Sequence, residues 1–163
     1  ATANAHFLKG KYDDADYFYG LLRSSYPQSD HLVQACVLGL RAKMRTYQGA
    51  LYDRTPLEDS KELVDQLLTQ FPNELGDERE RLLAARAEIM AQLAYRDWMM
   101  AEYYRRTKYY RAAGYYYNKI VREYPGTPFA QRAQEQLEAT RHLPPEPPRR
   151  LQWLADLLTR EDR

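Results

Sequence analysis

The chain has 163 residues, of which 44% are hydrophobic and 13% aromatic, with 15 tyrosines, which is enough for the core of one ordinary domain. Its 24 basic and 23 acidic residues give a net charge of +1, which argues against a broad phosphate-binding face and so against nucleic acid as a partner. No apolar run approaches the roughly 18 residues that suggest a membrane span, and the single cysteine, Cys36, excludes a disulfide scaffold and is expected to be buried in a helix.

The first helices are predicted close to the start of the chain. Residues 1–8 look like the end of a repeat's first helix, so we expect the chain to be a piece of a longer protein. A second helix is predicted over 13–25. Its first acids, Asp13, Asp14 and Asp16, suit the positive end of a helix dipole, which we favour over a metal cluster.

Two further helices are expected over 29–48 and 56–71. Gly39 lies inside the first of them, where glycine costs about 1 kcal/mol relative to alanine. We therefore expect a neighbouring helix to approach closely at this position. Ser29 and Thr55 are the predicted caps of the two helices.

The second half of the chain is expected to begin with an unusually long helix. Residues 77–106 contain neither glycine nor proline and consist mostly of good helix formers. A single helix of about 45 Å is therefore predicted. Helices over 109–124 and 127–141 follow.

The C-terminal end is expected to carry a separate helix. A proline-rich linker, 143–148, precedes the segment 149–163, in which a helix is predicted near 150–160. Leu151, Leu154 and Leu158 would form an apolar stripe on it, which is unfavourable in water. Two alternatives remain open, since the helix could cap the last repeat or occupy a groove in place of a partner's helix.

A pattern of tyrosines recurs along the chain. Tyr12-x-x-Ala15-x-Tyr17-x-Tyr19, followed by Tyr26-Pro27, is repeated at an offset of 98 residues, from Tyr110 (110 − 12 = 98) to Pro125. Tetratricopeptide repeats pair two helices around small residues, with a proline after the second helix. The pattern predicts an all-α, tetratricopeptide-like, right-handed helical solenoid over 1–142, with about three helix pairs, followed by the C-terminal helix. The residues expected to pack the repeats are Tyr12, Ala15, Tyr19, Pro27, Gly39, Tyr110, Ala113, Tyr117 and Pro125.

The sequence contains no recognisable catalytic or metal-binding motif. His6, His31 and His142 are isolated, with no other ligand at a suitable spacing. The acidic residues are expected to be solvated charges on helices. We therefore predict a non-enzymatic protein with no cofactor and no metal, because the usual work of stacked repeats is binding.

In repeats of this kind the first helix of each pair lines the concave face, which we predict to be the protein-binding surface. Aromatic and arginine side chains on such a face are common anchors for extended peptides. For Tyr95 and Trp98 the alternative is packing on neighbouring helices. The residues predicted to face inward are Tyr95, Trp98, Glu102, Arg105 and Arg106 on the long helix, and Cys36, Leu40, Lys43, Met44 and Tyr47 on the earlier helix.

One stretch of the sequence carries a family resemblance. Ala101-Glu102-Tyr103-Tyr104-Arg105-Arg106 is followed by Tyr110-x-x-Ala113 and then by Glu123-Tyr124-Pro125-Gly126-Thr127-Pro128. With these motifs, residues 94–139 resemble the BamD family of outer-membrane assembly lipoproteins, also called the ComL type. Residues 10–29 look like an earlier repeat of the same type.

The resemblance implies a periplasmic scaffold at the outer membrane, held there only by a lipidated N-terminal cysteine. Such a scaffold helps the barrel-inserting machinery to fold outer-membrane proteins and contacts the periplasmic domains of the barrel subunit. The alternative left open by the residues is a tetratricopeptide-type adaptor, cytoplasmic or periplasmic, which binds extended peptides or assembles another multiprotein complex.

Overall fold

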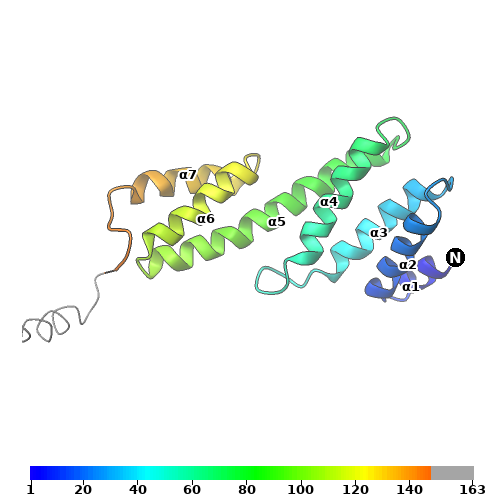
Figure 1. Cartoon of the computed structure of the whole chain (residues 1–163), viewed down its shortest axis with the longest axis horizontal. Coiled ribbons are helices and arrows are strands. Elements are labelled where there is room, and N and C mark those ends of the chain that lie inside the picture. The colour runs from blue at the N-terminus through cyan, green and yellow to red at the C-terminus, as the bar shows by residue number, and fades with distance from the viewer. Residues whose placement is uncertain (148–163) are drawn as a thin grey trace, which may run out of the picture. The chain divides into compact units, whose positions relative to one another are not determined.

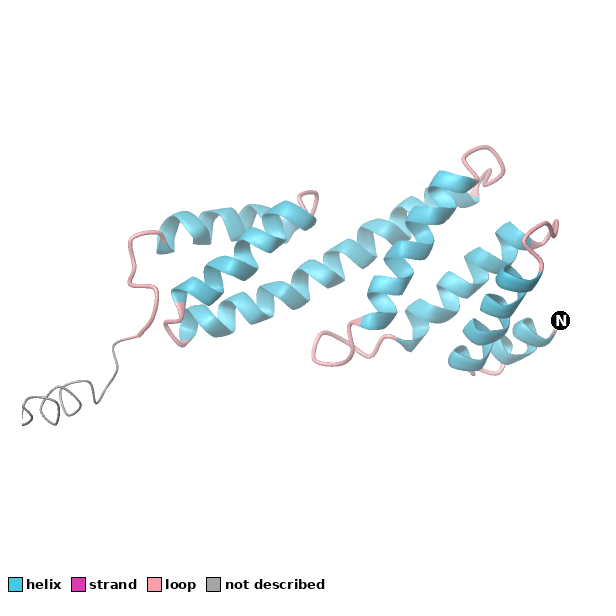
Figure 2. Cartoon of the chain, in the orientation of Figure 1, coloured by secondary structure: helices cyan, strands magenta, loops and turns pink. Residues whose placement is uncertain are grey.

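The computed structural model describes residues 1–147, and all regular structure in this part of the chain is α-helical (Figure 2). The all-α class predicted from the sequence is confirmed for these residues. The linker 143–148 is described up to residue 147, and the helix expected near 150–160 lies outside the described residues. The helices are α1 (Thr2–Leu8), α2 (Tyr12–Ser25), α3 (Leu32–Thr46), α4 (Thr55–Gln70), α5 (Glu78–Arg106), α6 (Tyr110–Glu123) and α7 (Pro128–Thr140).

The helices belong to two compact units. Unit 1 comprises Ala1–Arg96 with Gly126–Pro128, and unit 2 comprises Asp97–Pro125 with the described residues from Phe129 on. The long helix α5 contributes its first part to unit 1 and its last part to unit 2. Within unit 1, α1 packs on α2, α2 on α3 and α3 on α4 (Figure 1). That 1–142 forms one repeat domain stays a prediction.

Small residues allow the helices of unit 1 to approach one another closely. Ala15, Ala35 and Ala42 are buried in one cluster with Tyr19. A Cβ atom added at Gly39 would collide with the guanidinium of Arg23 and come within 3.2 Å of the Cβ of Tyr19. Gly39 is therefore needed because α2 lies directly against α3, as the sequence predicted.

The predicted helix caps are wrong in detail. Helix α3 begins at Leu32, and the Ser29 hydroxyl accepts a hydrogen bond from the amide of His31 at 3.2 Å in the turn before the helix. Thr55 is the first residue of α4, and its amide and hydroxyl donate to Asp53 at 3.0 and 2.9 Å. In both cases the polar side chain satisfies a turn rather than the free amides of the helix, and this choice depends on the path of the connector.

Helix α5 is continuous over its 29 residues, as predicted from the absence of helix breakers. Leu82, Ile89 and Leu93 lie on its buried face. The connector before α4 is held on α5 by Arg96, which donates to the carbonyls of Ala50 and Tyr52. Neither α5 nor any other described helix is long and apolar enough to cross a membrane.

The turn that joins the two helices of a hairpin has the same backbone in both units. Gly10, between α1 and α2, has φ of 73°, and Lys108, between α5 and α6 and 98 residues later (108 − 10), has φ of 65°. The amide of Lys11 donates to the carbonyl of His6 at 3.0 Å, and the amide of Tyr109 donates to that of Tyr104 at 2.9 Å. The recurring sequence pattern therefore coincides with a recurring turn.

The tyrosine and alanine positions of the two hairpins also correspond. Ala15 and Ala113 are both fully buried. The hydroxyl of Tyr19 donates to Asn4 at 2.7 Å, and the hydroxyl of Tyr117 donates to Glu102 at 2.5 Å. Among the other predicted packing residues, Tyr12 and Tyr110 are half-buried, Gly39 is buried, and Pro27 and Pro125 lie exposed just after their helices.

Candidate protein-binding surfaces

The residues predicted to line one concave face are divided between the two units. Those on α3, together with Tyr95, belong to unit 1, whereas Trp98, Glu102, Arg105 and Arg106 belong to unit 2. The two sets are therefore described separately, each within its own unit.

Two of the α3 residues are buried inside unit 1. Leu40 is 2% exposed and Cys36 is also buried, because α2 and α4 both pack against α3. Burial raises the pKa of the Cys36 thiol, as expected for an inert core cysteine. Met44 and Tyr47 are half-buried, and Tyr95 on α5 is exposed.

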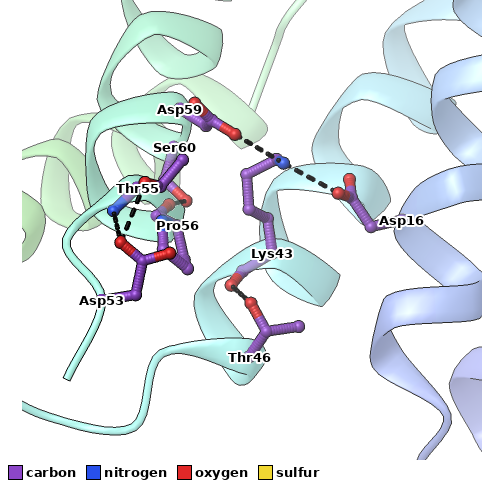
Figure 3. A network of polar contacts seen from close by, with 8 residues as sticks. All are labelled: Asp16, Lys43, Thr46, Asp53, Thr55, Pro56, Asp59 and Ser60. Carbon is purple, nitrogen blue, oxygen red and sulfur yellow. Dashed lines mark hydrogen bonds and ion pairs between the residues drawn. The ribbon is translucent and has the colours of Figure 1, made fainter.

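Lys43 joins three helices of unit 1. Its ammonium lies 2.8 Å from a carboxylate oxygen of Asp16 on α2 and 3.1 Å from one of Asp59 on α4 (Figure 3). Burial acts to lower the pKa of Lys43, but the hydrogen bonds to the two carboxylates outweigh it and the pKa is raised. Lys43 is therefore a charged cross-link between helices, and a partner would have to compete with two carboxylates to reach it.

Glu102 and Arg105 form a second charged cluster, in unit 2. The guanidinium of Arg105 donates to both carboxylate oxygens of Glu102, at 3.0 and 2.7 Å, and the Tyr117 hydroxyl donates to one of them. The bond from Arg105 is the main cause of the lowered pKa of Glu102. Burial, with the bond to Glu102, raises the pKa of Tyr117. The cluster stays ionised at neutral pH and fixes α6 against the end of α5.

Trp98 packs inside unit 2. Its ring lies 5.5 Å from that of Tyr117 and 6.0 Å from that of Phe129, measured between centroids. These contacts favour the packing alternative for Trp98. Arg106, at the end of α5, is exposed and bonds to the carbonyl of Glu102 at 3.3 Å.

Asp97 contradicts the expectation that the acids are solvated helix charges. It is 2% exposed and lies 3.0 Å from the ammonium of Lys119 on α6. A sequence signal was available, since Asp97 falls four residues after Leu93 and four before Ala101, both of which are buried. Its place on the apolar stripe predicts an ion pair with the neighbouring helix.

A row of four tyrosines forms a surface feature that the sequence reasoning missed. The rings of Tyr103, Tyr104, Tyr116 and Tyr115 follow one another at centroid distances of 5.4, 5.7 and 5.3 Å, and the middle pair is stacked. We call these four residues the tyrosine row. Tyr103 and Tyr115, at its two ends, are exposed. The signal was the two adjacent tyrosine pairs, one in each helix of the hairpin.

The regular structure of residues 1–147 is all helical, and with its two corresponding helix hairpins it is compatible with a tetratricopeptide-like helical protein. Residues 25–148 match the model of the YfiO family, described as outer membrane lipoprotein. The chain belongs to this family, which is the BamD family indicated by the motifs between residues 94 and 139. A comparison with curated proteins finds no match.

Proposed function

We propose that this chain is a non-enzymatic scaffold at the periplasmic face of the outer membrane, where it assists the assembly of outer-membrane proteins by binding other proteins. The observation that carries the proposal is the family match over residues 25–148. The helical hairpins support it, because proteins built from such units mostly present binding surfaces. Attachment to the membrane would come from a lipid anchor, as in the family.

We assign partner binding in unit 2 to the tyrosine row and to the exposed basic residues of the same helix hairpin. Tyrosine combines a large apolar ring with a polar hydroxyl and, like arginine, is enriched among residues that dominate binding energy. Arg106, Lys108 and Arg111, around the turn between α5 and α6, are exposed. This surface suits an acidic partner with apolar side chains, and we assign it to the periplasmic domains of the barrel-forming subunit.

The other predicted contact residues have different parts in this proposal. Glu102 and Arg105 position Tyr117 and the end of α5, so they act on binding indirectly. Tyr95, Met44 and Tyr47 remain candidate contacts in unit 1. Lys43 would contribute only by giving up an internal ion pair.

The test is binding of the full chain to the soluble periplasmic domains of the barrel-forming subunit of the same organism, measured by calorimetry. Tyr115 and Tyr17 form a matched pair, since they are equivalent by sequence and each is 66% exposed, but only Tyr115 belongs to the tyrosine row. We expect Tyr115→Ser to weaken binding about tenfold, equivalent to about 1.4 kcal/mol. Tyr17→Ser should leave it unchanged.

Two results would count against the proposal. If the unaltered protein does not bind these domains, the proposed partner is wrong. If the two serine variants bind with equal affinity, the tyrosine row is not the binding surface. That result favours an adaptor that binds through other residues. Substitution of Arg106 by Glu adds an independent check, because a charge at the rim should alter the association rate and its salt dependence.

A further inference from the structure

A cavity of about 370 Å³ lies in unit 1, where the second half of α2 meets α3 and the last turns of α4. Its wall is largely apolar, with Leu32 from α3, Leu63 and Leu67 from α4, and Phe71 just after α4. Gln66 and Gln70, also on α4, bring side-chain amides to it. Neither the tyrosine row nor the Lys43 cross-link contributes to this cavity.

Arg23 is the one charged side chain among the described residues that line this cavity. Its Nη1 atom is buried and has no hydrogen-bond partner in the described part of the chain. Lys43, Arg86 and Arg105 each form an ion pair with a carboxylate. Arg23 takes part in none of the ion pairs between described residues. A half-buried charge without a counter-charge is costly, so an acceptor supplied by a ligand would be stabilised at this site.

The surrounding sequence makes room for this guanidinium. A Cβ atom at Gly39 would collide with Nη1, and one at Gly20 would lie 3.6 Å from Nη2. Gly39 thus leaves room for the arginine head between α2 and α3, beside the cavity, whereas a side chain at Gly20 would make only an ordinary contact with it. The packing of the helices therefore fixes where this guanidinium lies, whereas an arginine on an open surface is free to move.

We propose that this cavity binds a carboxylate of an extended peptide, with an adjacent apolar side chain of the peptide against Leu63, Leu67 and Phe71. Arg23 supplies the counter-charge, and the amides of Gln66 and Gln70 supply further donors. A carboxylate matches the paired N–H groups of a guanidinium, and one guanidinium balances one carboxylate, whereas a phosphate would call for more positive charge. The site goes beyond the proposed function, because it lies in unit 1 and needs no barrel-assembly partner.

The test uses the full chain labelled with ¹⁵N and titrated with N-acetyl-leucine, in which a carboxylate is adjacent to an aliphatic side chain. N-acetyl-leucinamide is the uncharged match, and sodium chloride at the same concentration controls for ionic strength. We expect saturable shifts of amide signals from residues around Arg23 and Gly39 with the acid, and at least tenfold weaker binding of the amide. N-acetyl-Leu-Glu-amide distinguishes a side-chain carboxylate from a terminal one.

Variants of Arg23 decide whether this residue is responsible. Arg23→Gln should remove the preference for the acid, Arg23→Lys should retain part of it, and Arg79→Gln, which removes an exposed charge from α5, should change nothing. Equal binding of acid and amide overturns the proposal, and so does an acid preference that survives in Arg23→Gln. If the glutamine variant does not fold, the lysine variant and the comparison of acid with amide still test whether Arg23 binds the carboxylate. The readout involves no partner protein, so it is independent of the binding test for the tyrosine row.

Discussion

Tyr19 and Tyr117 occupy corresponding places in the two hairpins, but their hydroxyl groups are expected to contribute differently to stability. Both are buried, and each hydroxyl donates to a residue 15 positions earlier in the chain. The acceptor is the neutral Asn4 in unit 1 and the ionised Glu102 in unit 2. Hydrogen bonds to charged groups are worth about 1.5–3 kcal/mol, against about 0.5–1.5 for neutral pairs.

We therefore predict that Tyr117→Phe lowers the free energy of unfolding by about 1.5–3 kcal/mol and Tyr19→Phe by about 1 kcal/mol. Denaturant unfolding followed by circular dichroism measures both. The two variants remove the same hydroxyl from similarly buried rings, so each is the control for the other. Equal losses would mean that the bond from Arg105 already satisfies Glu102 without Tyr117.

The turn glycine gives a second prediction at the scale of single residues. Gly10 has φ of 73°, a conformation that costs an L-amino acid about 1–2 kcal/mol. Lys108 adopts the corresponding conformation in unit 2, so the turn tolerates a side chain at that cost. We expect Gly10→Ala to lower stability by about 1 kcal/mol in thermal melts. Gly126→Ala, at an open position with ordinary φ, should be neutral or slightly stabilising. An equal loss of stability in both variants would show that the positive φ of Gly10 is not the cause.

At the scale of helices, most of the described elements could be predicted from the sequence because their signals are local. Prolines or glycines lie in the connections between most of the helices, and the long stretch without either contains α5. The turn between α5 and α6 contains neither, and there Lys108 adopts the positive φ. The caps at Ser29 and Thr55 could not be predicted, because a polar side chain near a helix start can serve a turn or the helix. The place of Asp97 on the apolar stripe indicates that it needs a cationic partner. That this partner is Lys119 depends on which face of α6 meets α5, and only the packing decides that.

The candidate surfaces were harder to predict than the helices. Periodicity indicates which residues share a helix face, although α3 ends at Thr46 and so excludes Tyr47 from the predicted group. It does not indicate which face neighbouring helices cover, so Leu40 was placed on a surface and is buried. The tyrosine row was missed for the same reason, since Tyr104 and Tyr116 stack only when α5 and α6 are side by side.

The seam between α5 and α6 gives a prediction at the scale of helices. Ala113 is fully buried there, so Ala113→Leu must force the two helices apart. We expect a loss of about 1–3 kcal/mol in stability, the usual effect of overpacking. Ala139→Leu, at an exposed position on α7, is the matched control and should change stability by less than about 0.5 kcal/mol. Unchanged thermal melts of Ala113→Leu would show that Ala113 is not at a close contact.

At the scale of the whole molecule, the family was predictable and the partner was not. The motifs between residues 94 and 139 pointed to the BamD family, and the match extends over residues 25–148. These motifs include turn and packing residues such as Ala113 and Pro125, which maintain the fold. Partner choice depends on exposed side chains, and a change in those would leave intact the pattern by which the family is recognised.

The most direct test of the scaffold role is depletion of this protein in its source organism, followed by measurement of folded β-barrel proteins in the outer membrane. We predict that their amount falls several-fold, as judged by heat-modifiable mobility in gels. Expression of the unaltered gene or the Tyr17→Ser variant should restore it, and Tyr115→Ser should restore it only in part. Normal amounts of folded barrel proteins after full depletion would contradict the proposed role in outer-membrane assembly.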